Sequence, residues 1–264
     1  MTTLIICAKA KGTYAMSIDK AAGYADDSHD FIRAKIAGKS YVQIDRLDNT
    51  LSWSEPVHAI NWFNTRFMPL YNFYNLVAAR SVTRVGGKPI FKGRLTKHIT
   101  GDNKDLRTVL LLVRYPSPVN FKNMAENLYF KVVSLLRAMA VQDFTFCLSR
   151  VTQTDSVPAT LDATVSFAAH HFRGSADTID KVQVLADASS VMLDFASVKT
   201  HVLSSGGGKG TTAIESLMDG LILLSAPDTA ELESLFASVE YKHIIDQTES
   251  SFICLLYTSP SPRD

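Results

Sequence analysis

The sequence has no long apolar run and almost no net charge, and each shortage excludes a class of protein. No stretch approaches the roughly 18 consecutive apolar residues that a membrane-spanning helix needs. The apolar run near the N-terminus, Leu4 to Ala8, is too short for a signal peptide. Lysine and arginine total 27 against 26 acidic residues, so the net charge of +1 gives no general attraction for nucleic acid or an anionic membrane. We therefore predict a soluble cytoplasmic protein that binds neither.

Cysteine is also scarce. Cys7, Cys147 and Cys254 lie far apart, with no C-x-x-C spacing and no even framework. They indicate neither a zinc site nor a disulfide scaffold, and we interpret them as small buried hydrophobic residues in a reducing compartment. No His-x-x-x-His or histidine–carboxylate spacing supports a metal site either. We expect no metal and no other cofactor.

What the sequence does contain is a pattern that occurs twice. Aligning Pro116 with Pro227 places VLLLVRYPSPVNFKNMAENLYFK over MDGLILLSAPDTAELESLFASVEYK. Each copy has an apolar run, a proline, a helix-start residue and an amphipathic stretch, with Ser117 and Asp228 as the predicted N-caps. The apolar runs lack polar alternation, which is typical of strands covered on both faces.

The same elements recur upstream of both copies. The first set is strand Val57–Phe63, helix Pro69–Thr83, strand Pro89–Thr96, loop 100–105, strand 109–113 and, after the helix, strand Phe144–Ser149. The second set is strand Val165–Phe172, helix Thr178–Leu193, strand Val198–Ser204, loop 204–212 and strand Leu221–Leu224. This is the split βαβ, or ferredoxin-like, order. We assign residues 56–152 and 163–253 to two such units, and residues 1–55, with helices expected within 18–37, to an N-terminal α/β addition.

The last eleven residues, CLLYTSPSPRD, need a separate interpretation. They resemble, residue for residue, the translation in one frame of a common transposase-based sequencing adaptor. We therefore expect Cys254–Asp264 to be an artefactual tail outside the fold, and the natural chain to be cut short near Ile253.

The residues LLLVRYPSPVNFKNM, with INWFNTRF and GGKPIFKGRL upstream, resemble a small bacterial family of domains of unknown function in the dimeric α/β-barrel superfamily. Such domains commonly show Asn-x-x-x-x-Arg near the first strand, a glycine before the second, and Val-Arg-Tyr-Pro-Ser at the end of the third. The resemblance covers roughly residues 56–150, whereas residues 163–253 match only the shape of the superfamily.

This resemblance implies two ferredoxin-like units whose sheets face each other and form a barrel, usually from two chains. A tandem repeat would supply both units, so we expect an α+β pseudo-dimeric α/β barrel that is a monomer or a homodimer. The resemblance also implies a ligand pocket between sheet and helices, and relatives include cofactor-free oxygenases, lactone isomerases and haem enzymes. The fold alone does not choose among these activities.

Three arginines of the first unit are candidates for binding an anionic, partly apolar ligand. Arg114 can hold a carboxylate bidentately if it faces the pocket, and otherwise pairs with a local carboxylate or carbonyl. Arg94, on the neighbouring strand, and Arg66, after the first strand, could converge on the same volume. Tyr115 is a further candidate, although it and Arg114 must point to opposite faces of the strand.

Asn61 and Tyr71 complete the predicted binding residues. Asn61 lies between apolar neighbours in the first strand, so it is either a ligand contact or a structural hydrogen-bonding residue. Tyr71 shares a helix face with Tyr74 and either lines the pocket or packs in the core.

His58 and His171 are the candidate general bases, because histidine titrates near neutrality. His170 and His171 must point to opposite faces of their strand, so at most one of them lines a pocket. For each histidine the alternative is a structural role.

We therefore expect a small-molecule-binding protein, with cofactor-independent isomerase or oxygenase chemistry on an apolar carboxylate. The pocket is expected mainly in the first unit, because the second has Ser225 and Ala226 where the first has Arg114 and Tyr115. The alternative is a non-catalytic binding or assembly module in which Arg-Tyr-Pro-Ser only fixes the strand-to-helix turn. That alternative predicts a filled barrel without a cavity.

Overall fold

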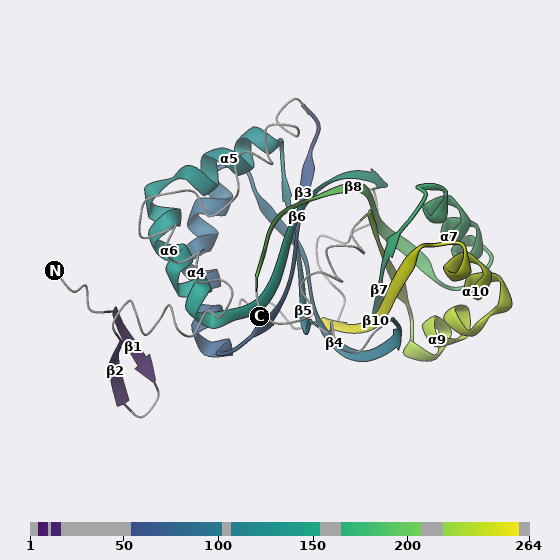
Figure 1. Cartoon of the computed structure of the whole chain (residues 1–264), viewed down its shortest axis with the longest axis horizontal. Helices are drawn as coiled ribbons and strands as arrows, with labels where there is room; N and C mark the ends of the chain where they lie inside the picture. Colours follow the sequence, from purple (N-terminus) through teal and green to yellow (C-terminus); the bar gives the residue numbers. More distant parts are fainter. Residues whose placement is uncertain are drawn as a thin grey trace.

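The computed structural model describes residues 5–9, 12–16, 54–101, 107–153, 165–206 and 219–258, and eight strands of this part close into an antiparallel barrel (Figure 1). The first half of the barrel, residues 54–153, contains β3 (Val57–Thr65), α4 (Met68–Arg84), β4 (Lys88–Thr100), β5 (Val109–Tyr115), α5 (Pro118–Glu126), α6 (Leu128–Ala140) and β6 (Val141–Gln153). The second half, residues 165–258, contains β7 (Ser166–Arg173), α7 (Asp177–Asp187), β8 (Met192–Gly206), β9 (Gly220–Ala226), α9 (Thr229–Ala237), α10 (Val239–Asp246) and β10 (Ser250–Thr258).

The two halves have the same strand order. Around the barrel the strands run β10-β4-β5-β3-β6-β8-β9-β7, so the first half contributes β4-β5-β3-β6 and the second β8-β9-β7-β10. The halves meet at two seams, β6 against β8 and β10 against β4, and both are antiparallel hydrogen-bonded pairs. Because both seams are paired, the described barrel has no free strand edge.

Each strand has one face toward the barrel interior and one toward a layer of helices. On β3, Ile60 and Trp62 pack in the interior with Phe91, while Val57 and Phe63 pack under the helices. Apolar side chains are therefore needed on both faces. This confirms the prediction, from the missing polar alternation, that the strands are covered on both sides.

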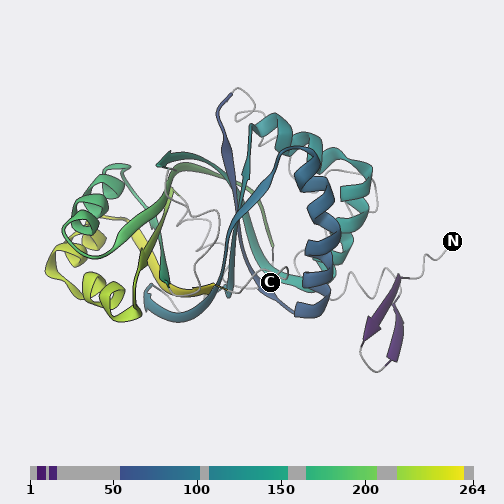
Figure 2. The same ribbon diagram turned by 180° about the vertical axis from the view of Figure 1, so that it is seen from behind.

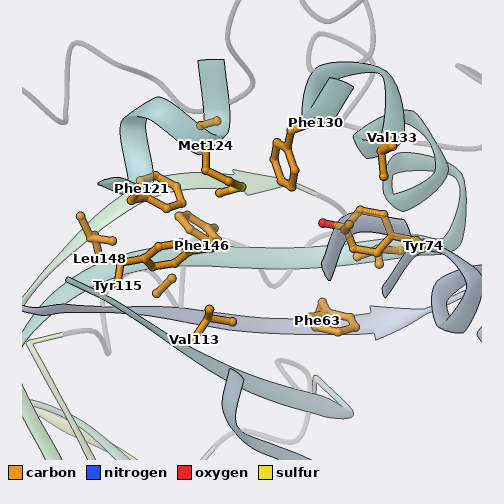
Figure 3. Close-up of a cluster of buried hydrophobic side chains, with 14 of the residues drawn as sticks. Phe63, Tyr74, Val113, Tyr115, Phe121, Met124, Phe130, Val133, Phe146 and Leu148 are labelled. Carbon is orange, nitrogen blue, oxygen red and sulfur yellow. The ribbon is translucent and has the colours of Figure 1, made fainter. Parts of the chain in front are cut away.

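Helices α4, α5 and α6 cover one side of the barrel, and α7, α9 and α10 cover the opposite side (Figures 1 and 2). Figure 3 shows the core beneath the first layer, where Tyr74, Phe121 and Phe130 of the helices meet Val113 and Phe146 of the sheet. Burial of each such side chain stabilises the fold by about 1.5–3 kcal/mol. This packing fixes the helices on the outer face of the sheet.

Each amphipathic stretch forms two helices, where the sequence suggested one. Ser117 and Asp228 cap the first helix of each pair, as predicted, by accepting a backbone N–H at 3.3 and 2.9 Å. A second N-cap follows in each half, because Asn127 and Ser238 accept the N–H groups of residues further along at 2.9 and 3.1 Å. The chain therefore ends one helix and begins another at the same point of both halves.

The predicted helix Thr178–Leu193 is too long. α7 ends at Asp187, and β8 begins at Met192, earlier than predicted. The hydroxyl of Ser189 donates to the carbonyl of Ala186 at 2.9 Å, a local bond that competes with continuation of the helix.

The expectation that Cys254–Asp264 lies outside the fold is wrong for residues 254–258, which form the C-terminal part of β10. Cys254 lies opposite Ala169 of β7 and His98 of β4, and it is buried together with Leu255 and Leu256. These three residues supply the apolar side chains that a strand covered on both faces needs. The closing strand of the barrel therefore includes residues that resemble an adaptor translation, while residues 259–264 lie outside the described part.

Of the N-terminal addition, the structure describes mainly the antiparallel pair of β1 (Ile5–Lys9) and β2 (Gly12–Met16). The helices expected within 18–37 lie outside the described residues, as do the loop residues 102–105 and 207–212. Within the described ranges, the helices are too short or too polar to cross a membrane.

Candidate functional site

The predicted site residues of β3 lie on two opposite faces of the sheet. His58 shares its face with Ile60 and Trp62 and points into the barrel interior, where its ring meets Phe195. Asn61 is on the other face, toward the helices. The two residues therefore cannot contact the same ligand.

In the interior, His58 lies between Arg114 on β5 and Ser149 on β6, each directly opposite it in the register. Directly opposite residues of antiparallel strands share a face, with their Cβ atoms about 4.5–5.5 Å apart. The ring of Phe195, on β8, is centred 5.1 Å from the imidazole. Arg114 is exposed at the end of β5, so a cation lies at the rim and His58 lies deeper, buried from solvent.

Burial and, to a lesser extent, the Arg114 cation lower the pKa of His58 to about 3, so the ring is neutral at neutral pH. The Nδ1 atom of His58 and the hydroxyl oxygens of Ser149 and Ser197 are buried, with no hydrogen-bond partner within the described ranges. Ser197 shares the interior face because it lies opposite Leu221, which packs there. Buried polar atoms nearly always have a partner, so these three indicate a place for water or for a polar ligand group.

His171 faces a different zone of the same interior. Its ring is centred 3.9 Å from that of Trp62, and burial, followed by the adjacent His170, holds its pKa well below the usual range. Trp62 lies about 13 Å along β3 from His58. The two candidate bases therefore do not form one catalytic centre.

His170 points away from the interior, as the alternation of strand residues predicts. Its Nδ1 atom is 2.9 Å from the hydroxyl of Tyr241, and its Nε2 atom is 3.0 Å from Oγ of Ser251. Burial lowers the pKa of His170 to about 3. Both ring nitrogens have partners, so this histidine has a structural role.

Asn61 makes a hydrogen bond within the protein. It accepts from Nη2 of Arg137, on α6, at 3.5 Å, and the buried guanidinium of Arg137 lies 5.9 Å from the ring of Phe63. This contact corresponds to the structural interpretation of Asn61, a hydrogen bond within the protein. Sequence reasoning missed Arg137, although an arginine within VVSLLRAMA is a signal, because a buried charge needs partners.

Tyr71 and Tyr115 both pack in the core under the helices. The ring of Tyr71 is centred 4.8 Å from Phe63, and that of Tyr115 is centred 5.2 Å from Phe121. Nζ of Lys92 lies 5.7 Å from the Tyr71 ring, and burial lowers the pKa of this lysine. Both tyrosines are therefore across the sheet from His58 and Arg114.

The structure does not bring Arg66 and Arg94 to Arg114. Arg94 is exposed and lies opposite Val109, at the other end of β5. This places it about 17 Å from Arg114 along the strand, and on the opposite face. Arg66 is exposed beyond the far end of β3, where its N–H donates to the carbonyl of Ala140 at 2.8 Å.

The helical layer of the first half contains a separate hollow of about 480 Å³. Its walls come from α4, α5 and the start of α6, and include Arg80, Arg84, Asn123, Met124, Asn127 and Tyr129. None of the eight residues predicted for the site lines it. The i, i+4 spacing of two arginines at the end of the predicted helix Pro69–Thr83 is the sequence signal for this place.

In the second half, Ser225 occupies the position of Arg114. It lies beside Asp194, which is at a bulge between Leu193 and Phe195 of β8. Burial raises the pKa of Asp194 to about 6, against the opposing effect of a hydrogen bond from Ser225. Within the part of the chain that the structure describes, no three His, Cys, Asp or Glu side chains gather to hold a metal ion.

No known family profile matches this sequence, and no curated protein matches it. Solved structures do resemble the fold. An anthrone oxidase-like protein is 11% identical, with 80% of this chain and 93% of that chain covered at a TM-score of 0.49. A mutant chlorite dismutase from Candidatus Nitrospira defluvii is 9% identical, with 81% and 95% covered at 0.45. A protein of unknown function from Rhodopseudomonas palustris is 19% identical, with 40% and 87% covered at 0.37.

Proposed function

We propose that the barrel is a tandem repeat of two ferredoxin-like units, residues 56–152 and a second unit that begins at 163 and extends through β10. The proposal is supported by the order strand, helix, strand, strand, two helices, strand in both halves, and by the equivalent strand order. One chain then supplies both sheets of a barrel. A monomer is complete without a partner, and a homodimer would use the outer surface.

We propose further that the protein binds a small, partly apolar anion at the end of the barrel interior that contains His58 and Arg114. The observation that carries this proposal is the group of buried polar atoms without partners within the described ranges, His58 Nδ1, Ser149 Oγ and Ser197 Oγ, on the interior face that Arg114 shares at its rim. A carboxylate at Arg114 would gain a charge-assisted pair. The adjoining polar atoms and the Phe195 ring would meet the rest of the ligand.

The finer part of the proposal is cofactor-independent isomerase or oxygenase chemistry, in which His58 takes a proton from the bound ligand. A general base is most effective when its pKa is near the working pH. The pKa of His58 is lowered to about 3, and the Arg114 cation is the smaller of the two causes of this lowering. A ligand carboxylate beside Arg114 would offset that cation, whereas the burial of His58, the larger cause, would remain.

The second candidate function is a non-catalytic binding or assembly module. It is favoured by the dense filling of the interior, where Trp62, Phe91, Phe167 and Phe252 are buried in one cluster. Interior side chains that only stabilise the barrel need no ligand. The two candidates differ in what His58 and Arg114 do.

Ligand uptake by the purified protein separates the two candidates. We expect native mass spectrometry to detect a co-purifying anion, and aromatic and fatty carboxylates to raise the melting temperature. Arg114→Gln should weaken binding of the best carboxylate at least about tenfold, because one charge-assisted hydrogen bond contributes about 1.5–3 kcal/mol. Arg94→Gln is the matched control, since it removes the same charge from an exposed site on the opposite face.

Equal affinity of the wild-type protein and Arg114→Gln would overturn the proposed site and favour the assembly module. If both arginine variants weaken binding equally, the attraction is a property of the overall surface charge. Turnover of a bound carboxylate by the wild-type protein, lost in His58→Gln while binding is retained, would support the catalytic part.

A further inference from the structure

The hollow in the helical layer has a wall of positive charge. Arg80 and Arg84 are four residues apart on α4, so their side chains are neighbours on one face of the helix. Within the described ranges neither forms an ion pair, and the lining contains no acidic side chain. Two like charges at this spacing repel each other, and an anion between them removes that repulsion.

The other residues that line the hollow are partly polar and partly apolar. Asn123 and Asn127 present side-chain amides, and the oxygen of Asn127 already accepts the N–H of Tyr129 at 2.9 Å, which leaves its NH₂ group as a donor toward the hollow. Met124 and Val85 supply apolar surface, with Met124 buried at the base. The half-exposed ring of Tyr129 adds an aromatic edge.

Hydrogen bonds between elements hold these walls in place. The hydroxyl of Tyr129 donates to the carbonyl of Val77 at 3.0 Å, which fixes the start of α6 against α4. The side-chain amide of Asn120 donates to the carbonyl of Val85 at 3.0 Å, which fixes the start of α5 against the end of α4. These bonds fix the helices that surround the hollow, and its volume is within the usual range for small-molecule sites.

We propose that this hollow is a second ligand site, which binds a small organic anion with a carboxylate or phosphate head group and an apolar body. The head group lies between Arg80 and Arg84, where both guanidinium groups donate hydrogen bonds to its oxygens. The apolar body lies against Met124, Val85 and the edge of Tyr129. The site is independent of the His58 end, because it is in the helical layer and the sheet separates it from the barrel interior.

Isothermal titration calorimetry with benzoate, phenyl phosphate and inorganic phosphate tests the proposal. The Arg114→Gln protein is the host, so that binding at the barrel interior is weakened and the hollow dominates the titration. We expect benzoate or phenyl phosphate to bind, and inorganic phosphate to bind more weakly because it lacks the apolar body. Adding Arg80→Gln and Arg84→Gln should raise the Kd of the organic probe at least about tenfold, since two charge-assisted hydrogen bonds are lost.

The matched control adds Lys122→Gln and Lys131→Gln, which remove the same total charge from the same helical layer but do not line the hollow. The control should keep the Kd within about twofold, because neither of these half-buried lysines lines the hollow. An unchanged Kd in the Arg80→Gln, Arg84→Gln protein would overturn the proposal, and so would an equal loss in the lysine control. Inorganic phosphate binding as tightly as phenyl phosphate would overturn the apolar part.

Discussion

The two faces of the barrel sheet treat their buried polar side chains differently. On the face covered by helices, both ring nitrogens of His170 have partners, and Asn61 accepts a hydrogen bond from Arg137. On the interior face, Nδ1 of His58 and the hydroxyl groups of Ser149 and Ser197 are buried with no partner in the described part of the chain. Unsatisfied buried atoms cost stability, so those on the interior face point to function.

The largest expected effect concerns the strand that joins the halves. Ending the chain at Ile253 removes residues 254–258 of β10, and with them buried Leu255 and Leu256 and the pairing with β4. We expect a loss of at least about 5 kcal/mol in the free energy of unfolding, because each buried leucine alone contributes about 2–5 kcal/mol. Urea unfolding followed by circular dichroism measures it.

Tyr257→Ser is the control for this truncation, since Tyr257 is on the same strand and half exposed. It should change the free energy of unfolding by about 0.5 kcal/mol or less. Identical urea midpoints for the truncated and complete chains would show that β10 does not hold the halves together.

A pair of substitutions tests the contrast between the two histidines. His170→Leu leaves the buried hydroxyl of Tyr241 without this partner, which should cost about 1–3 kcal/mol in the free energy of unfolding. His58→Leu removes a ring whose Nδ1 atom has no partner within the described residues, so we expect a change within about 1 kcal/mol of either sign. Urea unfolding at pH 7 compares the two variants, and equal losses of stability would contradict the distinction between the two faces of the sheet.

The smallest expected effect is the pH dependence that Asp194 contributes. Its pKa is about 6 in the folded protein, above the ordinary aspartate value of the unfolded chain. The unfolded chain therefore releases this proton first, and stability falls as the pH rises from about 4 to above 6. Asp194→Asn should remove that fall, which is about 1 kcal/mol after allowance for solvent screening.

Thermal unfolding of wild type and Asp194→Asn at pH 4 and pH 7.5 provides the measurement. The variant should be the more stable of the two at pH 7.5 and should lose this advantage at pH 4. A stability difference that is the same at both pH values would show that Asp194 does not titrate as its burial implies.

Most of the elements could be predicted from the sequence, because local chemistry determines them. The apolar runs gave the central strands, and Ser117 and Asp228 marked the helix starts that the structure contains. The second caps, Asn127 and Ser238, were missed because they lie inside a continuous amphipathic pattern. No strand is predicted from the sequence at β10, because its residues 254–258 resemble an adaptor translation, although their apolar character is typical of a buried strand.

The candidate site was less predictable, because it depends on cross-strand register. Alternation along one strand correctly separated His170 from His171. It could not show that His58 lies opposite Arg114, or that Arg94 lies opposite Val109 on the other face. Register is set by long-range pairing, and a shift of one residue exchanges the two faces.

The two seams of the barrel have a further consequence for symmetry. In a barrel made from two identical chains, every substitution appears at two positions that are related by a two-fold rotation, so the interior must have the same symmetry. Here the seams β6–β8 and β10–β4 join two different sequences within one chain. His58 can therefore face Phe195 without a second histidine having to face a second phenylalanine. The fused chain can therefore give the two halves of the interior different side chains at equivalent positions, which a pair of identical halves could not do.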